Sequence, residues 1–468
     1  MKHTALLLLA TSLLSMAPAS RPSDAISSEA IAATLRDKAL HDDSVAWDFV
    51  SELTTRFGPR PAGSAAELAA AQWSERRMKA LGFENVRVET FPLTAWVRGA
   101  ERAEIVAPAA QPLVAASLGG APPTPPGGVE GEVVTFANIE ALRAAAPGSL
   151  TGKIAMITFH MPRTQDGSGY GFAVAARGYG PLEAAKRGAI GFMLRSVATG
   201  GHRFAHTGAT RYEDGRVPIP AFALAEPDGD QIERLVQLGE KVRVRLTSNA
   251  SYVPNAKSYN VIGEIRGAAR PNEVVVLGAH LDSWDQGTGA IDDAAGCAIV
   301  TAAARLAREA PRRPQRTIRV VLYGSEEVTQ PADTQLGGRT YLEARRAELA
   351  NHIAAGESDF GADRVYSVAL PKGGFASPFG QSLLRVLAPL GIIQTDATPQ
   401  GGSDVGPLGQ AGVPLFDLNQ DGSTYFDFHH TADDTLDKVD PAALSQNAAA
   451  WTAFAWLAAD SDVNFRKP

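Results

Sequence analysis

The chain has 468 residues, of which 45% are hydrophobic, and this length allows two or three domains with substantial cores. A net charge of −7 provides no basic surface for nucleic acid, so no nucleic-acid partner is expected. Because Cys297 is the only cysteine, no intrachain disulfide can form.

The first residues, MKHTALLLLATSLLSMAPAS, have the features of a secretory leader. Lys2 precedes a short apolar run, and Ala-Pro-Ala at 17–19 is typical of a cleavage site. We expect residues 1–19 to be a signal peptide, with a membrane anchor as the alternative. The apolar run is short for a membrane span, so we expect no stable membrane insertion after cleavage. A cysteine-poor exported protein is typical of a bacterial periplasm or culture medium, which predicts a secreted or periplasmic protein.

Residues 20–95 are expected to form the N-terminal part of the main domain. Amphipathic patterns predict helices over residues 44–57 and 64–81. Ser64 is the expected N-cap of the second helix, because Glu67 follows three residues later. The segment FENVRVETFPL then alternates polar and apolar residues, which predicts a strand.

Residues 96–250 differ in their sequence pattern from the segments on either side and are expected to be an inserted domain. They contain the turn-rich connection APPTPPGGVEGEVV, the buried strand GKIAMITFH, and a helix followed by a strand in PLEAAKRGAIGFMLRS. We find no convergent set of His, Asp and Glu in this segment, and therefore interpret it as a binding or lid domain. Its histidines His160, His202 and His206 are expected to be ordinary surface or core residues.

Residues 251–468 are expected to form the main part of the catalytic domain, because strand-like and helix-like segments alternate there. The strands are SYNVIGEIRG, EVVVLGAH, TIRVVLYGS and DRVYSVAL, and the helices are DDAAGCAIVTAAARLAREA and SPFGQSLLRVLAPLG. Cys297 falls in the first of these helices, as a small buried hydrophobe. The pattern predicts an α/β fold with a mixed, mainly parallel sheet, parallel in its centre and covered by helices on both faces.

Polar side chains follow several of these segments. They are His280 and Asp282 after EVVVLGA, Glu326 and Glu327 after TIRVVLYGS, Asp359 after HIAAGES, and His429 and His430 in FDFHHTADDT. Open α/β sheets bind ligands at the carboxyl ends of their strands, so we expect these groups to converge. Imidazoles and carboxylates without thiolates suit zinc, and five ligands with one shared carboxylate can hold two ions roughly 3.5–4 Å apart. One carboxylate of the glutamate pair then remains to accept a proton from an activated water.

Taken together, GAHLDSW…GAIDDAAG, GSEE, ESD and FHHTADDT resemble the motifs of the co-catalytic dizinc exopeptidase family, which includes bacterial zinc aminopeptidases and glutamate carboxypeptidases. The pattern is most similar to the carboxypeptidase Q branch, because of HLDSWD, the double histidine and the insert bounded by proline and glycine. The resemblance covers most of the mature chain and is strongest over residues 260–439. It implies the zinc exopeptidase fold, a protease-associated-like domain at 96–250, and a homodimer by analogy.

The resemblance also implies a role for each site residue. Two zinc ions per chain would be bound by His280, Asp292, Glu327, Asp359 and His430. Asp292 would bridge the two ions, Glu326 would be the general base, and Asp282 would orient His280. The peptide bond between Asp292 and Asp293 would be cis, with Asp293 opening the helix that follows and bracing a metal-bound histidine.

The pattern leaves several neighbouring residues open. His429 either contacts substrate or only hydrogen-bonds to the backbone. Asp434 either supports His430 or caps the following helix, and Asp404 either lines the site or braces its glycine turn. Residues 328–338, VTQPADTQLGG, form a longer loop than relatives carry after the glutamate pair, so a relative's specificity does not transfer directly.

These observations predict an exported zinc-dependent exopeptidase that hydrolyses dipeptides or small peptides. The alternative is an enzyme that acts from the other end of the peptide, an aminopeptidase that releases neutral N-terminal residues. Two rivals come from other classes: a glutaminyl cyclase-type acyltransferase, which uses one zinc, and a catalytically inactive binding protein of the same fold.

Overall fold

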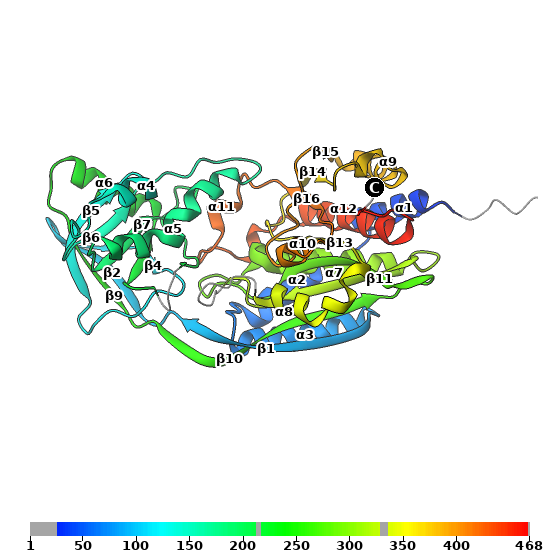
Figure 1. Cartoon of the computed structure of the whole chain (residues 1–468), viewed down its shortest axis with the longest axis horizontal. Coiled ribbons are helices and arrows are strands. Elements are labelled where there is room, and N and C mark those ends of the chain that lie inside the picture. Colours follow the sequence, from blue (N-terminus) through cyan, green and yellow to red (C-terminus); the bar gives the residue numbers. More distant parts are fainter. Residues whose placement is uncertain (1–25, 212–216, 328–335, 467–468) are drawn as a thin grey trace, which may run out of the picture.

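The computed structural model describes residues 26–211, 217–327 and 336–466. The expected signal peptide at 1–19 and most of the loop at 328–338 lie outside these residues. The described chain forms two lobes joined by a long antiparallel ribbon (Figure 1). The ribbon pairs β1 (Glu84–Val97) with β10 (Ser251–Ile265), and the chain between these two strands forms the second lobe.

The main sheet combines parallel and antiparallel pairs. Within the described residues its strand order is β1, β10, β12, β11, β13. The remaining bounds are Arg270–His280 for β11, Arg316–Tyr323 for β12 and His352–Glu357 for β13. β11 pairs in parallel with β12 and β13, whereas β10 pairs antiparallel with β1 and β12. The expected mixed α/β sheet with a parallel centre is confirmed.

Helices cover both faces of this sheet, so the side chains of its central strands are buried on both sides. Val275 and Leu277 belong to the larger core, and Val274 and Val276 belong to a smaller one. The larger core also includes buried residues of α1 (Ser28–His41), α2 (Val45–Phe57), α3 (Ala65–Ala80), α7 (Ala295–Arg308), α9 (Pro378–Leu387) and α12 (Pro441–Asp460). The smaller core includes residues of α8 (Leu336–Ala344) and α10 (Gly406–Gln410).

Local signals explain several helix boundaries. The hydroxyl of Ser64 accepts a hydrogen bond from the Glu67 main-chain N–H, so the expected N-cap of α3 is confirmed. α12 is rich in alanine and is buried from Ala443 to Ala459 except at Ser445, which is typical of a helix in the centre of a core. None of the helices in the described ranges is long and apolar enough to cross a membrane.

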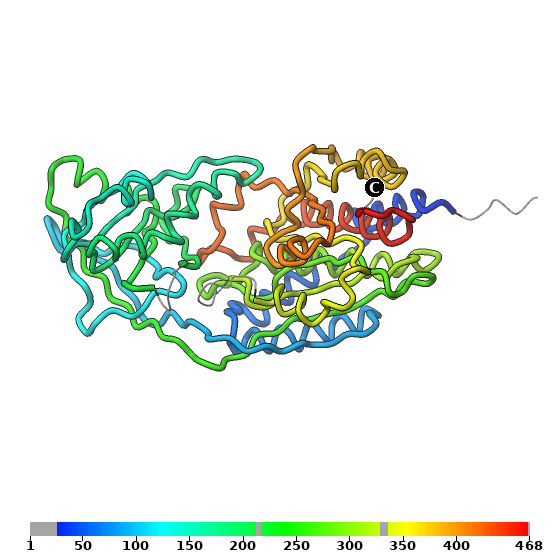
Figure 2. Tube along the Cα trace, viewed as in Figure 1, coloured from blue at the N-terminus to red at the C-terminus, as the bar shows by residue number. Residues whose placement is uncertain are grey.

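A small second sheet extends the main lobe. It contains β15 (Ile393–Gln394), β14 (Val365–Ala369) and β16 (Asp417–Gln420), in that order. The segment DRVYSVAL therefore forms a strand as expected, but in this small sheet and not in the main one. After β16 the chain runs through α11 (Tyr425–Phe428) into the space between the lobes, where the tube of Figure 2 is orange.

The second lobe contains its own sheet, with strand order β3, β2, β9, β5, β6, β7, β8, β4 in the part of the chain that the structure describes. The bounds are Glu101–Ala107 for β2, Gln111–Leu113 for β3, Ala115–Ser117 for β4, Val129–Phe136 for β5, Ile154–Ile157 for β6, Gly191–Arg195 for β7, Ala221–Leu224 for β8 and Arg243–Ser248 for β9. Its helices are α4 (Ile139–Ala144), α5 (Ser168–Lys186) and α6 (Glu226–Gln237). We call residues 96–250 the inserted domain, with the boundary expected from the sequence, so that its first two residues are the last two of β1. Its helix α5 lies on the side that faces α11 (Figure 1).

Candidate active site

Three parallel strands bring polar residues to one edge of the main sheet. β11 ends at His280, β12 ends three residues before Glu326, and β13 ends two residues before Asp359. Because β11 pairs in parallel with both neighbours, these three strand ends lie side by side. Asp292, from the turn before α7, and His430, just after α11, complete the group.

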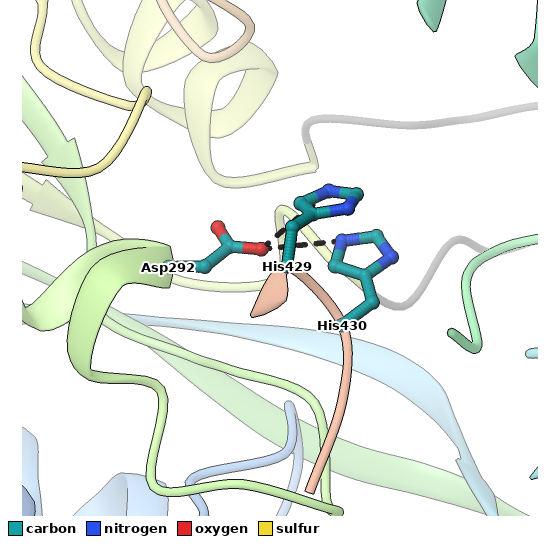
Figure 3. A group of neighbouring side chains, drawn as sticks. All are labelled: Asp292, His429 and His430. Carbon is teal, nitrogen blue, oxygen red and sulfur yellow. Dashed lines mark ion pairs between the residues drawn. The ribbon is translucent and has the colours of Figure 1, made fainter. Parts of the chain in front are cut away.

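The two carboxylate oxygens of Asp292 face different histidines. Oδ1 lies 3.1 Å from Nε2 of His280. Oδ2 lies 3.2 Å from Nε2 of His430 and 3.7 Å from Nε2 of His429, and Figure 3 shows these two histidines beside Asp292. The same nitrogen of His280 is 3.1 Å from Asp359 Oδ1, and that of His430 is 3.0 Å from Glu327 Oε2. The five residues that the sequence suggests as ligands therefore form two trios that share Asp292.

This geometry fits a pair of metal ions. Two ligand atoms of one tetrahedral zinc lie about 3.4 Å apart when each bond is about 2.1 Å long, close to the separations within each trio. Burial, together with the charges of Asp292 and Glu326, raises the pKa of Glu327 well above its usual value. Its Oε1 is buried without a hydrogen-bond partner among the described residues. Crowded buried carboxylates of this kind require positive charge nearby, which bound cations supply.

Asp293 holds the backbone of the candidate ligands. The Asp292–Asp293 peptide bond is cis, as the family resemblance implies. Asp293 Oδ2 accepts the main-chain N–H of His280 at 3.0 Å, and its Oδ1 accepts that of Gly296 at 3.0 Å in the first turn of α7. One carboxylate thus joins the end of β11 to the start of a helix. Cys297 is buried beside it, and its thiol donates to the His280 carbonyl.

Asp282 contacts a different partner from the one we expected. His280 Nδ1 lies 3.0 Å from the main-chain carbonyl of Asp282, whereas the carboxylate oxygen is 3.9 Å away. The carboxylate instead accepts the main-chain N–H groups of Glu326 at 3.0 Å and Glu327 at 3.2 Å. Asp282 therefore orients His280 through its backbone, and its side chain fixes the loop that carries both glutamates.

The neighbours of Glu326 and Glu327 indicate different tasks for these two residues. Both side chains line the same pocket, but only Glu327 lies beside a candidate ligand histidine in the described structure. Burial and the charge of Asp359 raise the pKa of Glu326 to about 7. A carboxylate with that pKa can both accept and donate a proton near neutral pH.

The structure also places the residues that the sequence left open. The His429 ring stacks on His430 with 3.5 Å between ring centroids, lines the pocket, and has no hydrogen-bond partner at Nδ1 in the described chain. Asp434 neither supports His430 nor caps a later helix. Its Oδ1 accepts the N–H groups of Ala290 and Ile291, just before Asp292. Asp404 lies outside the pocket lining and accepts the Gly338 N–H at 3.1 Å.

The pocket has a volume of about 310 Å³ and is lined by both lobes. The main lobe contributes Asp292, Glu326, Glu327, Asp359, Phe360, Ser403, Tyr425, Phe426, His429 and His430, and the inserted domain contributes Tyr170, Val174, Arg177, Gly178, Ala209 and Arg211. Our sequence analysis missed the second group. The one available signal was Arg177, a charged residue inside the apolar and glycine-rich run GFAVAARGYG.

His206 is a core histidine, as expected, whereas the expectation that the inserted domain has no convergent set of His, Asp and Glu is wrong. His206 is buried, and its Nδ1 donates to the His429 carbonyl at 2.7 Å, so it contacts the active-site loop. The inserted domain also contains a convergent set that the sequence did not suggest: His160 lies 3.7 Å from Asp230 and 3.6 Å from Glu233. This set is partly exposed, and Arg195 forms an ion pair with Asp230 at 2.6 Å, which disfavours a bound cation there.

Comparisons with known proteins show which family the chain resembles. The profile of peptidase family M28 matches residues 260–455. Carboxypeptidase Q of Mus musculus is 33% identical over 410 residues, which cover 88% of this chain and 84% of the mouse protein. The crystal structure of a peptidase M28 precursor from Shewanella amazonensis is 43% identical, with a TM-score of 0.89 and coverage of 93% of this chain and 98% of that one.

A more distant structure shares the fold. A zinc aminopeptidase from Bacillus subtilis matches 90% of this chain and 96% of its own, with a TM-score of 0.64 at 20% identity. The identity and coverage of the mouse and Shewanella proteins are high enough to establish the family. The chain belongs to peptidase family M28 and is a metallo-exopeptidase, a hydrolase of peptide bonds.

Proposed function

We propose that this metallo-exopeptidase binds two zinc ions and hydrolyses dipeptides or small peptides with a free C-terminal carboxylate, as a carboxypeptidase Q-like enzyme. The observation that carries the two-ion site is the position of Asp292, whose two oxygens face His280 and His430 separately. His280, Asp359 and Asp292 would hold one ion, and His430, Glu327 and Asp292 the other.

The residues around this site divide the catalytic work. When bound, the ions would lower the pKa of a water molecule and polarise the scissile carbonyl. Glu326 accepts the proton of the attacking water and passes it to the leaving amine nitrogen, which suits a carboxylate that lines the pocket and is not a candidate metal ligand. Asp282 holds the Glu326 and Glu327 backbone, so that both carboxylates face the pocket.

Arg177 supports the proposed polarity. It is 6% exposed, donates to the Tyr170 hydroxyl at 2.6 Å, and has no hydrogen-bond partner at Nε among the described residues. Its guanidinium packs against Gly208, where a Cβ would lie 2.4 Å from Cζ. A fixed guanidinium in the same pocket as the metal ligands suits a carboxylate, whereas the positively charged amine of an aminopeptidase substrate would be repelled.

The test is hydrolysis of one neutral dipeptide in three forms: free, N-acetylated and C-terminally amidated. We expect the amide to be hydrolysed at least tenfold more slowly than the free form, since a hydrogen bond to a charged group contributes about 1.5–3 kcal/mol. Arg177→Met should raise KM for the free dipeptide by a similar factor and leave the amide unaffected. Arg203→Met is the matched control, because Arg203 is an exposed arginine of the inserted domain, paired with Asp228.

Other outcomes identify the rival functions. If acetylation abolishes turnover and amidation does not, the enzyme is an aminopeptidase. Turnover that survives complete zinc removal by a chelator contradicts the metal site. Cyclisation of an N-terminal glutamine peptide would indicate the acyltransferase, and zinc binding without any hydrolysis would indicate the inactive binding protein.

We also propose that residues 1–19 are cleaved on export, that residues 96–250 form a protease-associated-like domain, and that the mature enzyme is a secreted or periplasmic homodimer. Support for export comes from Lys2, the apolar run and the small residues at 17–19. Support for the domain comes from its separate sheet between β1 and β10. N-terminal sequencing of the mature protein and light scattering test the leader and the dimer.

A further inference from the structure

The inserted domain contacts the adjacent residues His429 and His430 through residues 206 and 207. His430 Nδ1 lies 3.2 Å from the Thr207 carbonyl, and the Thr207 N–H donates to the His430 carbonyl at 3.0 Å. His206 Nδ1 donates to the carbonyl of His429. We call these three hydrogen bonds the clasp. Because His206 and Thr207 are both buried, the clasp is shielded from water.

The clasp matters because a carbonyl can only accept a hydrogen bond. Nδ1 of His430 must therefore carry the proton, which leaves Nε2 free to face Asp292 and Glu327 as a ligand atom. His280 obtains the same help from its own loop, since its Nδ1 contacts the Asp282 carbonyl. The two trios thus differ, because only His430 depends on an acceptor from the inserted domain.

Thr207 is itself held by Arg98, at the point where the chain enters the inserted domain. Arg98 is 7% exposed, and its Nη2 donates to Thr207 Oγ1 at 3.1 Å. The same guanidinium binds Asp285 through two hydrogen bonds of 2.8 Å. Asp285 belongs to the main lobe, so this ion pair anchors Arg98, and through it Thr207, to the main lobe, whereas His280 is positioned separately by the Asp282 carbonyl.

We propose that the inserted domain is an integral part of the metal site that contains His430: the Thr207 carbonyl orients His430, and Arg98 and His206 are positioning residues that hold this clasp. The inference rests on the proposed two-zinc site. It predicts an asymmetric defect, in which loss of the clasp weakens the site of His430 and spares the site of His280. Loss of a partner that orients a metal-bound histidine typically lowers metal affinity 10–100-fold.

The test is zinc titration of the metal-free full chain against a competing chelator. The wild type should bind two zinc ions. Arg98→Met should bind one with unchanged affinity and the other 10–100-fold more weakly, and saturating zinc should restore much of the activity. Arg102→Met is the matched control, because Arg102 is an exposed arginine four residues away, paired with Glu104. It should bind both ions like the wild type.

Variants of His206 test the clasp independently, in case Arg98→Met fails to fold. His206→Asn keeps an N–H group near the position of Nδ1 and should retain both affinities, whereas His206→Leu should weaken one site. Equal weakening of both sites, or two unchanged sites in folded Arg98→Met and His206→Leu, overturns the inference while the proposed function stands. A wild type that binds fewer than two zinc ions overturns the proposed two-zinc site and this inference together.

Discussion

Replacing Glu326 with glutamine should separate the general base from the metal ligands. The Glu326 backbone is fixed by Asp282, and its side chain lines the pocket without the 3.0 Å contact that joins Glu327 to His430. An amide of the same size keeps this packing but cannot accept the proton of water. Removal of a general base typically costs 10²–10⁴ in rate, which corresponds to about 2.7–5.4 kcal/mol of activation free energy.

The assay is kcat/KM on the free dipeptide, together with zinc content after dialysis, for Glu326→Gln and Glu327→Gln side by side. We expect Glu326→Gln to retain two zinc ions and lose most turnover, and Glu327→Gln to lose zinc as well as turnover. Glu343→Gln is the control, because Glu343 is a surface residue paired with Arg346.

Equal zinc loss in both variants would refute this assignment of the adjacent pair. Zinc loss in Glu326→Gln alone would exchange the two roles. If Glu326→Gln kept more than about a tenth of wild-type turnover, another group would have to be the base, because general-base catalysis contributes at least about 10².

Two further predictions concern stability. Burial lowers the pKa of His352 to about 4. The neutral ring donates from Nδ1 to the Glu348 carbonyl and accepts at Nε2 from the Tyr341 hydroxyl. The stabilisation by neutral His352 is therefore complete above pH of about 6.5 and is lost as the pH falls towards 4. The free energy of unfolding should fall by about 3 kcal/mol more in the wild type than in His352→Asn over that range, as urea titrations at several pH values would measure, and parallel curves would contradict it. A Cβ on Gly296 would lie 2.0 Å from the Ser358 carbonyl oxygen and 2.2 Å from Asp293 Oδ1. Gly296→Ala should therefore lower the free energy of unfolding by about 1–3 kcal/mol or more and weaken zinc binding, as calorimetry and zinc titration would measure. Gly406→Ala is the control and should change neither quantity, because a Cβ on Gly406 would have no atom within 4 Å.

The main-lobe half of the site was accessible from the sequence for a physical reason. A buried parallel strand is a continuous apolar run, so a histidine or carboxylate directly after such a run is conspicuous. His280, Glu326 and Asp359 all follow strands of the same parallel group, and chain order alone brings them to one edge of the sheet. Asp292 and His430 come from turns, and their assignment depended on the family resemblance.

The details that the sequence could not predict involve main-chain atoms. Every residue has a carbonyl, so no pattern of side chains distinguishes the Asp282 carbonyl, which contacts His280, from the Asp282 carboxylate, which we expected to do so. The long ribbon is a related case. The expected strand begins at Ser258, yet β10 begins at Ser251, because its first residues pair with β1.

The contribution of the inserted domain to the pocket escaped prediction because it depends on how two lobes meet. Arg177 and Thr207 come from parts of the chain that carry no metal-binding pattern. Their proposed roles depend on residues more than 200 positions away: Arg177 lines the same pocket as His430, and the Thr207 carbonyl contacts the His430 ring. If Thr207 orients a ligand and Arg177 binds the substrate carboxylate, the inserted domain serves metal binding and specificity at once. A domain that only covered the pocket would need neither the buried Arg98 linkage nor the reciprocal hydrogen bonds to His430.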